Sequence, residues 1–400
     1  MSGIGDQVVV IFDGTISRNR VSHILKISKI LSGLEKKITV SISRIDKKAI
    51  MDIIENKSDI GDIFVLDTKH PLVKNDKSFL VKELILQLVQ LLRLRRKLCA
   101  SANKFIVMGT LNLSALAVFC FCSKNVYVFA GGFAYMSDIS RSLNYRGSRN
   151  IINFVKSYII YLIELIIIFL ANYLIIESKY IRKYVPFSHK IRGILKRKVI
   201  DYGSLFVDAD LFKIWVPIDE REDVVGYIGS LEPYRAIVQL VLSFKIIARV
   251  RSNAKFLIIG SGSLYDKVYK LINDDPELKF KTTLLGYVPY KDIPNYLNRI
   301  KVLVFLTESE GLPNTILEAL ACGCVVLTTP VGGIPDVIKE DVRGFYVTSL
   351  HPKDIAMRII QVLDMPKDTF RSISLQSHTF VKEYYSFEYT LKKWGHILGE

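Results

Sequence analysis

Cysteine is scarce in this chain of 400 residues, and its placement argues against two kinds of site. The cysteines are five, an odd number, and lie in or beside apolar runs: Cys99, Cys120, Cys122, Cys322 and Cys324. The two Cys-x-Cys pairs have neither zinc-finger spacing nor nearby histidines. We therefore expect reduced thiols in the core of an intracellular protein, with no disulfide framework and no metal site.

The sequence also shows no signal-peptide pattern and no internal repeat. Residues 1–6 carry neither the charged region nor the continuous apolar region of a signal peptide. No repeat of solenoid period is evident. Half of the residues are hydrophobic, so the chain suits two domains of ordinary size, and we expect a cytoplasmic location.

Acidic residues are outnumbered, 39 against 55 basic ones, which leaves a net charge of +16. This surplus favours a polyanionic partner such as nucleotide phosphates, an anionic membrane or nucleic acid, although a merely solvated basic surface also explains it. Residues 93–97 and 178–200 concentrate the charge, and the second stretch has eight basic residues and no acid. A basic face beside an apolar helix suits peripheral binding to anionic lipid. Nucleic acid is less favoured, because no known binding module accompanies the charge.

Residues 158–176 form the longest apolar stretch, interrupted by Glu164 and Asn172. Nineteen residues are enough to span a bilayer. An acid such as Glu164 costs about 2.5–3.5 kcal/mol at the bilayer centre. We favour a buried helix to about Leu170 followed by a strand at 173–176, ahead of a membrane-surface role or a true span.

Alternating strand and helix patterns predict an α/β protein with parallel, doubly wound sheets. Apolar runs predict strands at residues 8–12, 38–42, 63–66, 105–108 and 126–129. Helices are predicted at 21–31 and 79–98, with a turn at 13–15 and an apolar helix between the last two strands. The polar, proline-bearing stretch 215–223 predicts the interdomain linker. We expect domains at 1–217 and 218–383, with a final helix, about 384–400, packed back on the first.

The segment from Thr307 to Gly323 is the most informative. It follows an apolar run at 302–306, predicted as a buried strand, and places Glu310 and Glu318 eight positions apart. Residues 310–313 predict a turn, and Asn314 or Thr315 is the expected cap of the next helix. A helix N-terminus after such a turn suits phosphate, and carboxylates suit sugar or ribose hydroxyls. Two solvated glutamates on a surface helix are the alternative.

A second glycine-rich turn, residues 330–335, follows the apolar run 325–327. Neighbouring strand ends of this kind bind ligands in open α/β sheets. The first segment resembles the EGxPxxxLEAxAxG donor motif of the retaining GT-B glycosyltransferases, in particular family 4, the glycosyl transferases group 1. Further similar segments follow in the order of the family, at residues 225–236, 256–264 and 284–289, with looser ones at 171–178 and 199–204.

This resemblance implies two Rossmann-like domains facing across a cleft, and a retaining, metal-independent, hexosyl-type transferase that uses a UDP- or GDP-linked sugar and no cofactor. It implies Glu310 near the donor sugar, Glu318 on the ribose, and Arg235 neutralising the leaving diphosphate. Glu310 and Arg235 are the expected catalytic residues. The other expected donor-binding residues are Gly14, Ser230, Gly260, Gly262, Tyr287, Val288, Gly311, Leu312, Pro313, Asn314 and Thr315.

The chain departs from the family at three places. Ser230 stands where arginine is usual, which removes a charge-assisted contact worth about 1.5–3 kcal/mol. Gly131-Gly132 stands where a histidine-glycine pair is common, so the acceptor-side histidine cannot be assigned; His70 is one candidate, and a surface histidine is the better explanation. Tyr202 replaces an asparagine. Asp208 and Asp210 form a D-x-D triplet that we discount as a metal site.

We therefore expect a transferase that builds a surface polysaccharide or glycolipid on a glycan or lipid-linked acceptor, located in the cytoplasm and peripheral to the membrane. No convincing nucleophile is present. The alternative is a non-catalytic GT-B subunit that binds nucleotide-sugars or acts as a scaffold. A nucleic-acid binder is a third possibility that rests on charge alone.

Overall fold

The computed structural model describes residues 7–16, 18–34, 37–45, 62–65, 104–108, 125–130, 162, 165–176, 178–179, 199–201, 206–308 and 310–399. The chain divides into two compact units. We call residues 1–205 with 390–400 the N-terminal unit, and residues 206–389 the C-terminal unit. The expected sites at His70, Gly131-Gly132 and Tyr202, the helix at 79–98 and the apolar helix before residue 125 all lie outside the described residues.

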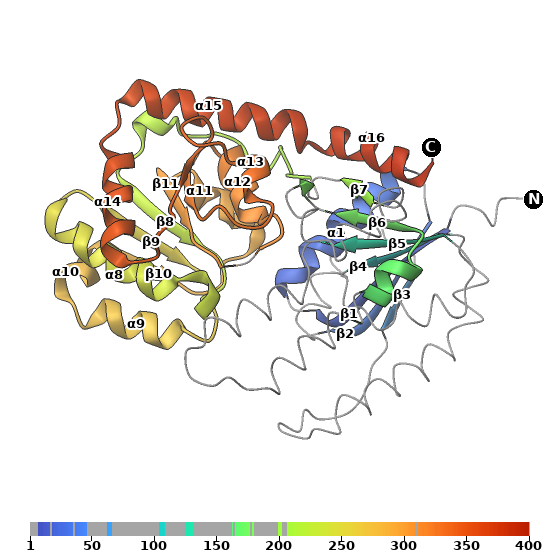
Figure 1. Cartoon of the computed structure of the whole chain (residues 1–400). Coiled ribbons are helices and arrows are strands. Elements are labelled where there is room, and N and C mark those ends of the chain that lie inside the picture. The colour runs from blue at the N-terminus through green and yellow to red at the C-terminus, as the bar shows by residue number, and fades with distance from the viewer. Residues whose placement is uncertain are drawn as a thin grey trace, which may run out of the picture. The chain divides into compact units, whose positions relative to one another are not determined.

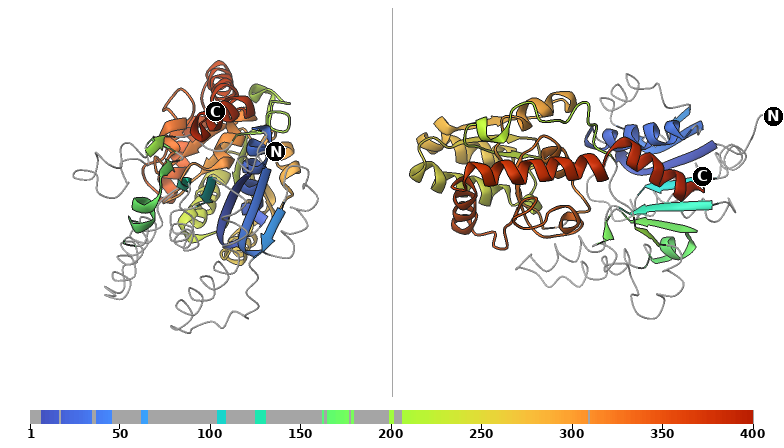
Figure 2. Two further views of the ribbon diagram at one scale, coloured as in Figure 1. Left: turned by 90° about the vertical axis from the view of Figure 1, so that its right-hand side faces the viewer. Right: turned by 90° about the horizontal axis from the view of Figure 1, so that it is seen from above.

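The N-terminal unit contains a parallel sheet, drawn from blue to green in Figures 1 and 2. Its described strands are β1 (Gln7–Ile16), β2 (Lys37–Ile45), β3 (Asp62–Val65), β4 (Lys104–Met108), β5 (Asn125–Ala130), β6 (Tyr173–Ile176) and β7 (Val199–Asp201). Helix α1 (Arg18–Gly33) follows β1. The strand order β3-β2-β1-β4-β5-β6-β7 reverses direction at β1, which confirms the predicted doubly wound sheet.

Two sequence predictions in this unit meet the structure differently. The turn predicted at Asp13–Thr15 is wrong, because β1 continues to Ile16 and shifts its register with β2 between Phe12 and Thr15. This local irregularity accommodates the glycine without ending the strand. The apolar stretch divides into helical residues 165–170 and strand β6, as favoured. The helix is buried on one side only, because Ile166, Phe169 and Leu170 are 51%, 61% and 43% exposed, so the expectation of a buried helix is wrong in this respect. Among the described residues, no helix is long and apolar enough to cross a membrane.

The C-terminal unit is a second doubly wound domain (Figure 1). Its strands are β8 (Val224–Ile228), β9 (Lys255–Ile259), β10 (Thr282–Leu285), β11 (Val302–Phe305), β12 (Val325–Thr328) and β13 (Phe345–Tyr346), in the order β10-β9-β8-β11-β12-β13. Its helices are α8 (Ile237–Val250), α9 (Tyr265–Asn273), α10 (Pro276–Lys281), α11 (Ile293–Leu297), α12 (Asn314–Ala321), α13 (Ile334–Val337), α14 (Pro352–Leu363) and α15 (Lys367–Tyr384). Helix α16 (Phe387–Leu398) begins here and continues into the N-terminal unit.

Both faces of this second sheet are buried. Along β11, Val302 and Val304 join one hydrophobic cluster with residues of α8 and α14, whereas Leu303 and Phe305 join another with residues of α11 and α12. Successive side chains of a strand point to opposite faces, so an unbroken apolar run is what a strand covered on both sides requires. The four residues of β11 are completely buried, as this pattern predicts.

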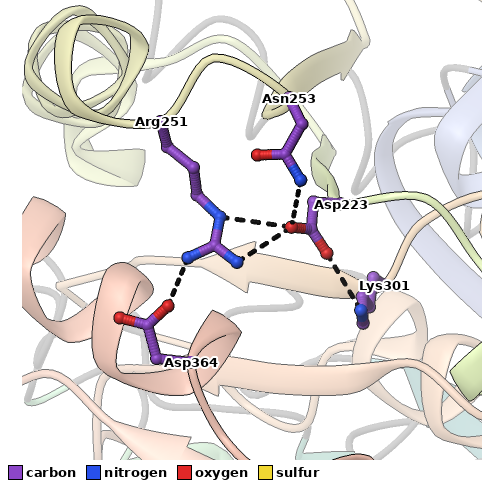
Figure 3. A network of polar contacts seen from close by, with 5 residues as sticks. All are labelled: Asp223, Arg251, Asn253, Lys301 and Asp364. Atoms are coloured by element: carbon purple, nitrogen blue, oxygen red, sulfur yellow. Dashed lines mark hydrogen bonds and ion pairs between the residues drawn. The ribbon is translucent and has the colours of Figure 1, made fainter.

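A polar network holds β8 beside β11 at the amino ends of these two strands (Figure 3). Asp223, the residue before β8, accepts hydrogen bonds from Arg251 (2.9 Å) and Lys301 (2.9 Å), and also from Asn253 (2.9 Å). Arg251 reaches Asp364 after α14 as well. Burial alone would raise the pKa of Asp223, but the hydrogen bonds from Lys301 and Arg251 outweigh it and hold that pKa below its usual value. Because the network holds the amino ends of β8 and β11 together, it also fixes the position of the loops that follow their carboxyl ends.

The stretch predicted as a linker, residues 215–223, is tied into the C-terminal unit. Arg221 is only 6% exposed and donates to the backbone oxygens of Val216 (2.8 Å), Ile300 (2.7 Å) and Cys322 (2.6 Å). Phe212 is likewise buried in this unit. The division therefore falls between residues 205 and 206, and again between 389 and 390, rather than near 217 and 384. At the far end, Lys104 donates to the backbone oxygen of Leu398 within the N-terminal unit.

Candidate functional site

The loop after β8 carries the only cation between residues 229 and 236, Arg235. Short helix η5 (Pro233–Arg235) ends at Ala236 in a left-handed conformation, φ 47°. Glu232 holds the loop against the next one by accepting hydrogen bonds from the backbone N–H (3.0 Å) and hydroxyl (2.6 Å) of Ser263. Because Glu232 is engaged in this way, it does not compete for Arg235. The loop therefore presents a fixed positive charge at the end of β8.

Arg235 is packed between aromatic rings and paired with a carboxylate. Its guanidinium carbon lies 4.9 Å from the centre of the Tyr234 ring and 4.8 Å from that of Phe305. Its Nη1 forms an ion pair with Glu310 Oε2, and the side chains are 12% and 23% exposed. Its Nε is buried and has no hydrogen-bond partner among the described residues. The two residues predicted to be catalytic are thus brought into direct contact, and Arg235 keeps donor capacity for a further acceptor.

Two loops after neighbouring strands lock together around Glu310. The backbone N–H of Gly333 donates to the oxygen of Gly311 (2.6 Å). Gly332 has a φ of +58°, and a Cβ there would lie 1.7 Å from the backbone oxygen of Glu310. Deeper in, the Thr329 hydroxyl donates to the oxygen of Thr307 (2.7 Å). Only a glycine allows this approach, so the second glycine turn positions the first rather than standing apart from it.

Glu318 lies in α12 and is 5% exposed. Its Oε1 accepts a hydrogen bond from the hydroxyl of Tyr290 at 2.8 Å, and the Tyr290 ring packs against Phe212 with centres 5.3 Å apart. Burial, with Glu318 adding to it, raises the pKa of Tyr290 far above its usual value. Tyr290 was not predicted as a site residue. Its position three residues after Tyr287 is a weak signal, because only the folded chain brings it to Glu318.

The helix after the donor motif begins differently from the prediction. Its N-cap is Pro313 (φ −68°), which has no side-chain oxygen to cap the first turn, and α12 begins at Asn314. The expectation that Asn314 or Thr315 caps the helix is therefore wrong. The ring of Pro313 fixes φ at −68°, which is compatible with the residue that enters the helix. With no side-chain cap, the first turn presents backbone N–H groups and the positive end of the helix dipole beside Glu310 and Gly311.

The remaining predicted residues of the C-terminal unit also lie in loops that follow the carboxyl ends of strands. Gly260 and Gly262 follow β9, and a Cβ would lie 1.8 Å from the oxygen of Gly229 and 2.5 Å from that of Leu231, so these glycines let two loops touch. Ser230 brings no charge, and its hydroxyl lies 3.4 Å from that of Tyr234. Tyr287 is 49% exposed after β10, and Val288 is partly buried. Leu312 is 5% exposed.

Gly14 lies in β1 of the N-terminal unit, within the register shift and not in a turn. Among the described residues, no group of three or more His, Cys, Asp or Glu side chains is placed to hold a metal ion. A pocket of about 170 Å³ opens elsewhere in the C-terminal unit, between residues 207–213 and the end of α15. It contains none of the predicted donor residues, and Phe212 separates it from Tyr290.

The site lies where an open α/β sheet binds its ligand. The strand order reverses between the neighbours β8 and β11. After β8 the chain adds β9 and β10 on one side, and after β11 it adds β12 and β13 on the other side. Arg235, Glu310 and the start of α12 all follow the carboxyl ends of these two strands. A cation, uncapped backbone N–H groups and two carboxylates suit a ligand that has both phosphate and hydroxyl groups.

Comparison with known proteins agrees with this geometry. Residues 210–374 match the family model described as glycosyl transferases group 1. The chain is similar to the capsular polysaccharide biosynthesis glycosyltransferase CapM of Staphylococcus aureus, 28% identical over 222 residues, which cover 52% of this chain and 57% of that protein. It is also similar to a poly(ribitol-phosphate) alpha-N-acetylglucosaminyltransferase of S. aureus, 27% identical over 239 residues, covering 56% and 46%. The matched part is thus less than two thirds of either relative.

The fold extends over almost the whole chain. The structure of Anabaena Alr3699/HepE in complex with UDP and glucose aligns with a TM-score of 0.69 and 14% identity, covering 98% of this chain and 99% of that one. This likeness confirms the GT-B fold. The match to the glycosyl transferases group 1 model itself is confined to residues 210–374, less than half of the chain.

Proposed function

We propose that this chain is a retaining glycosyltransferase that moves a hexose-type sugar from a nucleotide-sugar to a glycan or lipid-linked acceptor, in the synthesis of a surface polysaccharide or glycolipid. The observation that carries the proposal is the Arg235–Glu310 pair at the reversal point of the second sheet. The names of the two S. aureus relatives, a capsule enzyme and a poly(ribitol-phosphate) transferase, support this class of acceptor.

The reaction breaks the bond between the anomeric carbon and a phosphate oxygen, and forms a bond from that carbon to an acceptor hydroxyl oxygen. Negative charge then develops on the leaving diphosphate. Arg235, which is largely buried, places a positive charge where this develops, and a charge fixed before the reaction is the most effective kind. The start of α12, where the N-cap Pro313 makes no side-chain capping bond, brings the backbone N–H groups of Asn314 and Thr315 toward the same phosphates. No metal ion is part of this proposal.

The two carboxylates, Glu310 and Glu318, bind different hydroxyl groups of the donor. Glu318, buried in α12, holds the ribose, and Glu310, beside Arg235, faces the transferred sugar. The half-exposed ring of Tyr287 and the backbone of Val288 meet the base. For retention, the acceptor approaches the face from which the diphosphate leaves, and a donor phosphate oxygen takes the acceptor proton. These steps require no protein nucleophile.

A thermal-shift screen with UDP-, GDP- and ADP-sugars tests the donor site. We expect one nucleotide series to stabilise the wild type and to lose this effect in Glu318→Gln, a substitution that keeps the shape of the side chain. Glu220→Gln is the matched control, because exposed Glu220 lies just before β8, at the opposite edge of the sheet. Stabilisation that survives in Glu318→Gln would place the donor elsewhere.

Turnover distinguishes this proposal from a non-catalytic GT-B subunit, which Ser230 favours because its hydroxyl contributes no charge to the phosphate loop. We expect transfer to an acceptor, undiminished by EDTA, and NMR of the product should show the anomeric configuration of the donor. Donor binding without transfer to any glycan or lipid-linked acceptor would favour the scaffold. Inversion of the anomer would refute the retaining mechanism.

A further inference from the structure

The helical residues before β6 expose a row of large apolar side chains. Leu162 is 40% exposed, Ile166 51%, Phe169 61% and Leu170 43%. These positions are separated by four, three and one residues, a spacing that places them on one side of an α-helix. The opposite side packs into the core, since Ile167, Ile168 and Ala171 are at most 2% exposed. We call the four exposed residues the apolar face.

Such a face is uncommon on a protein surface that meets only water. Scattered apolar side chains are normal, but a contiguous group marks a site of contact with a protein or a membrane. Tyr173, at the start of β6, is also 36% exposed and stacks on Tyr127 with ring centres 4.8 Å apart. Tyrosine beside aliphatic side chains is typical of a membrane interface, because its ring has one apolar body and one polar end.

The distribution of charge along the chain indicates what binds the apolar face. The N-terminal unit has 34 lysines and arginines and 16 acids, a net charge of +18, whereas the C-terminal unit has 21 and 23, a net charge of −2. The whole surplus therefore belongs to the unit that carries the apolar face. Exposed Lys179 follows β6, and residues 179–198 hold eight basic side chains without an acid. Apolar area and a basic surplus together suit a surface of anionic lipid.

We propose that the apolar face of Leu162, Ile166, Phe169 and Leu170 docks the N-terminal unit onto the surface of an anionic bilayer. The side chains enter the boundary between headgroups and acyl chains, and the net positive charge of the same unit attracts it to the anionic headgroups. The inference does not depend on the proposed sugar transfer, because lipid binding is measured without donor or acceptor. If transfer to a lipid-linked acceptor is established, this face sets where the acceptor is met.

A reporter at Phe169 tests insertion directly. The full chain with Phe169→Trp is mixed with vesicles of phosphatidylcholine and 30% phosphatidylglycerol, with acyl chains brominated to quench tryptophan. The matched control is Phe280→Trp, since Phe280 is 90% exposed on α10 of the weakly acidic unit. We expect quenching in Phe169→Trp beyond the level that wild-type Trp215 and Trp394 show, and no additional quenching in Phe280→Trp. Equal quenching in the two variants would overturn the proposal.

Sedimentation with the same vesicles measures affinity. We expect the wild type to partition at least about tenfold more strongly into vesicles with phosphatidylglycerol than into phosphatidylcholine alone. Ile166→Ser with Leu170→Ser should lower partitioning by about tenfold or more, with an unchanged circular dichroism spectrum. Binding that the double variant retains in full would show a purely electrostatic contact. Absence of vesicle binding, with a dimer that the double variant dissociates, would assign the face to a second copy of the chain. Either result refutes docking.

Discussion

Tyr290→Phe removes one atom from the candidate site and tests how its buried carboxylate is held. The hydroxyl of Tyr290 donates to Glu318 at 2.8 Å, and Glu318 is 5% exposed, so solvent has little access to replace the lost donor. A hydrogen bond to a charged group contributes about 1.5–3 kcal/mol to stability. We expect the free energy of unfolding of the C-terminal unit to fall by this amount, because the phenylalanine ring keeps the packing against Phe212.

Thermal unfolding measures the change. For a unit of 150–250 residues, each kcal/mol shifts Tm by about 2–4 °C, so Tyr290→Phe should lower it by roughly 3–12 °C. Tyr269→Phe is the matched control, because Tyr269 is 55% exposed on α9 and should change Tm by less than about 2 °C. An unchanged Tm in Tyr290→Phe would refute the reasoning, since it would mean that the carboxylate finds an equivalent donor.

The same pair predicts a difference in alkaline solution. The pKa of Tyr290 is raised by burial and by Glu318, so above pH 10 the unfolded chain releases this proton while the folded chain keeps it. Stability then falls with rising pH. The loss is smaller than the full value of about 1.4 kcal/mol per pH unit for one group, because the Tyr290 side chain is 37% exposed and solvent screens the interaction. The stability difference between wild type and Tyr290→Phe should therefore shrink above pH 10 and stay constant between pH 7 and 9. A difference that grows above pH 10 would contradict the assignment.

Three further changes act on other parts of the C-terminal unit. Asp223→Asn should lower stability by about 1.5–3 kcal/mol at pH 7. Because the folded pKa of Asp223 is depressed, denaturant unfolding should show the loss fading as the pH falls below about 4, and a loss that is constant down to pH 2.5 would contradict this. Gly332→Ala should weaken donor binding at least about tenfold by displacing the backbone at Glu310, whereas Gly286→Ala, with open space around its Cβ, should not, as titration calorimetry can show. Arg221→Met should lower Tm by more than 6 °C, because it leaves several buried carbonyl groups without a donor.

Most strands could be predicted because each needs only a short apolar run, and burial on both faces makes that run unbroken. Residues 302–305 are a clear case, with every side chain buried. The turn at Asp13–Thr15 failed because glycine serves both a turn and a register shift within a strand, and the sequence does not separate the two. The boundary at 205–206 was missed because Arg221 ties a polar, proline-bearing stretch into the core through contacts with residues as far along the chain as Cys322.

The candidate site was predictable where its residues share a motif. Glu310, Gly311 and Glu318 belong to one segment, and Arg235 follows an apolar strand in the matching order. The contact between Tyr290 and Glu318 was not predictable, since it joins positions 28 residues apart through the packing of two loops. The direct pairing of Arg235 with Glu310 was also not foreseen, because both residues were assigned to the donor rather than to each other.

Because of this pairing, both Glu310 and the diphosphate of the donor require the guanidinium of Arg235. Ser230 supplies no charge, so Arg235 is the one cation of the loop at residues 229–236, and Glu310 already occupies its Nη1. A diphosphate must compete with Glu310 for this guanidinium. Glu310→Gln removes the competing charge and should tighten the binding of the preferred nucleoside diphosphate about fivefold, the equivalent of roughly 1 kcal/mol for a partly exposed pair.

Transfer should respond in the opposite direction. The same Glu310→Gln variant loses the carboxylate facing the donor sugar, so its turnover should fall by a factor of about 100 or more. Calorimetry with the nucleoside diphosphate and a transfer assay on one preparation separate the two effects, with Glu220→Gln as the control for both. Weaker diphosphate binding in Glu310→Gln would mean that Glu310 orients Arg235 for the phosphates instead of competing with them. Tighter diphosphate binding together with lost turnover would show that Glu310 lowers the affinity of Arg235 for the leaving group but is required at the donor sugar.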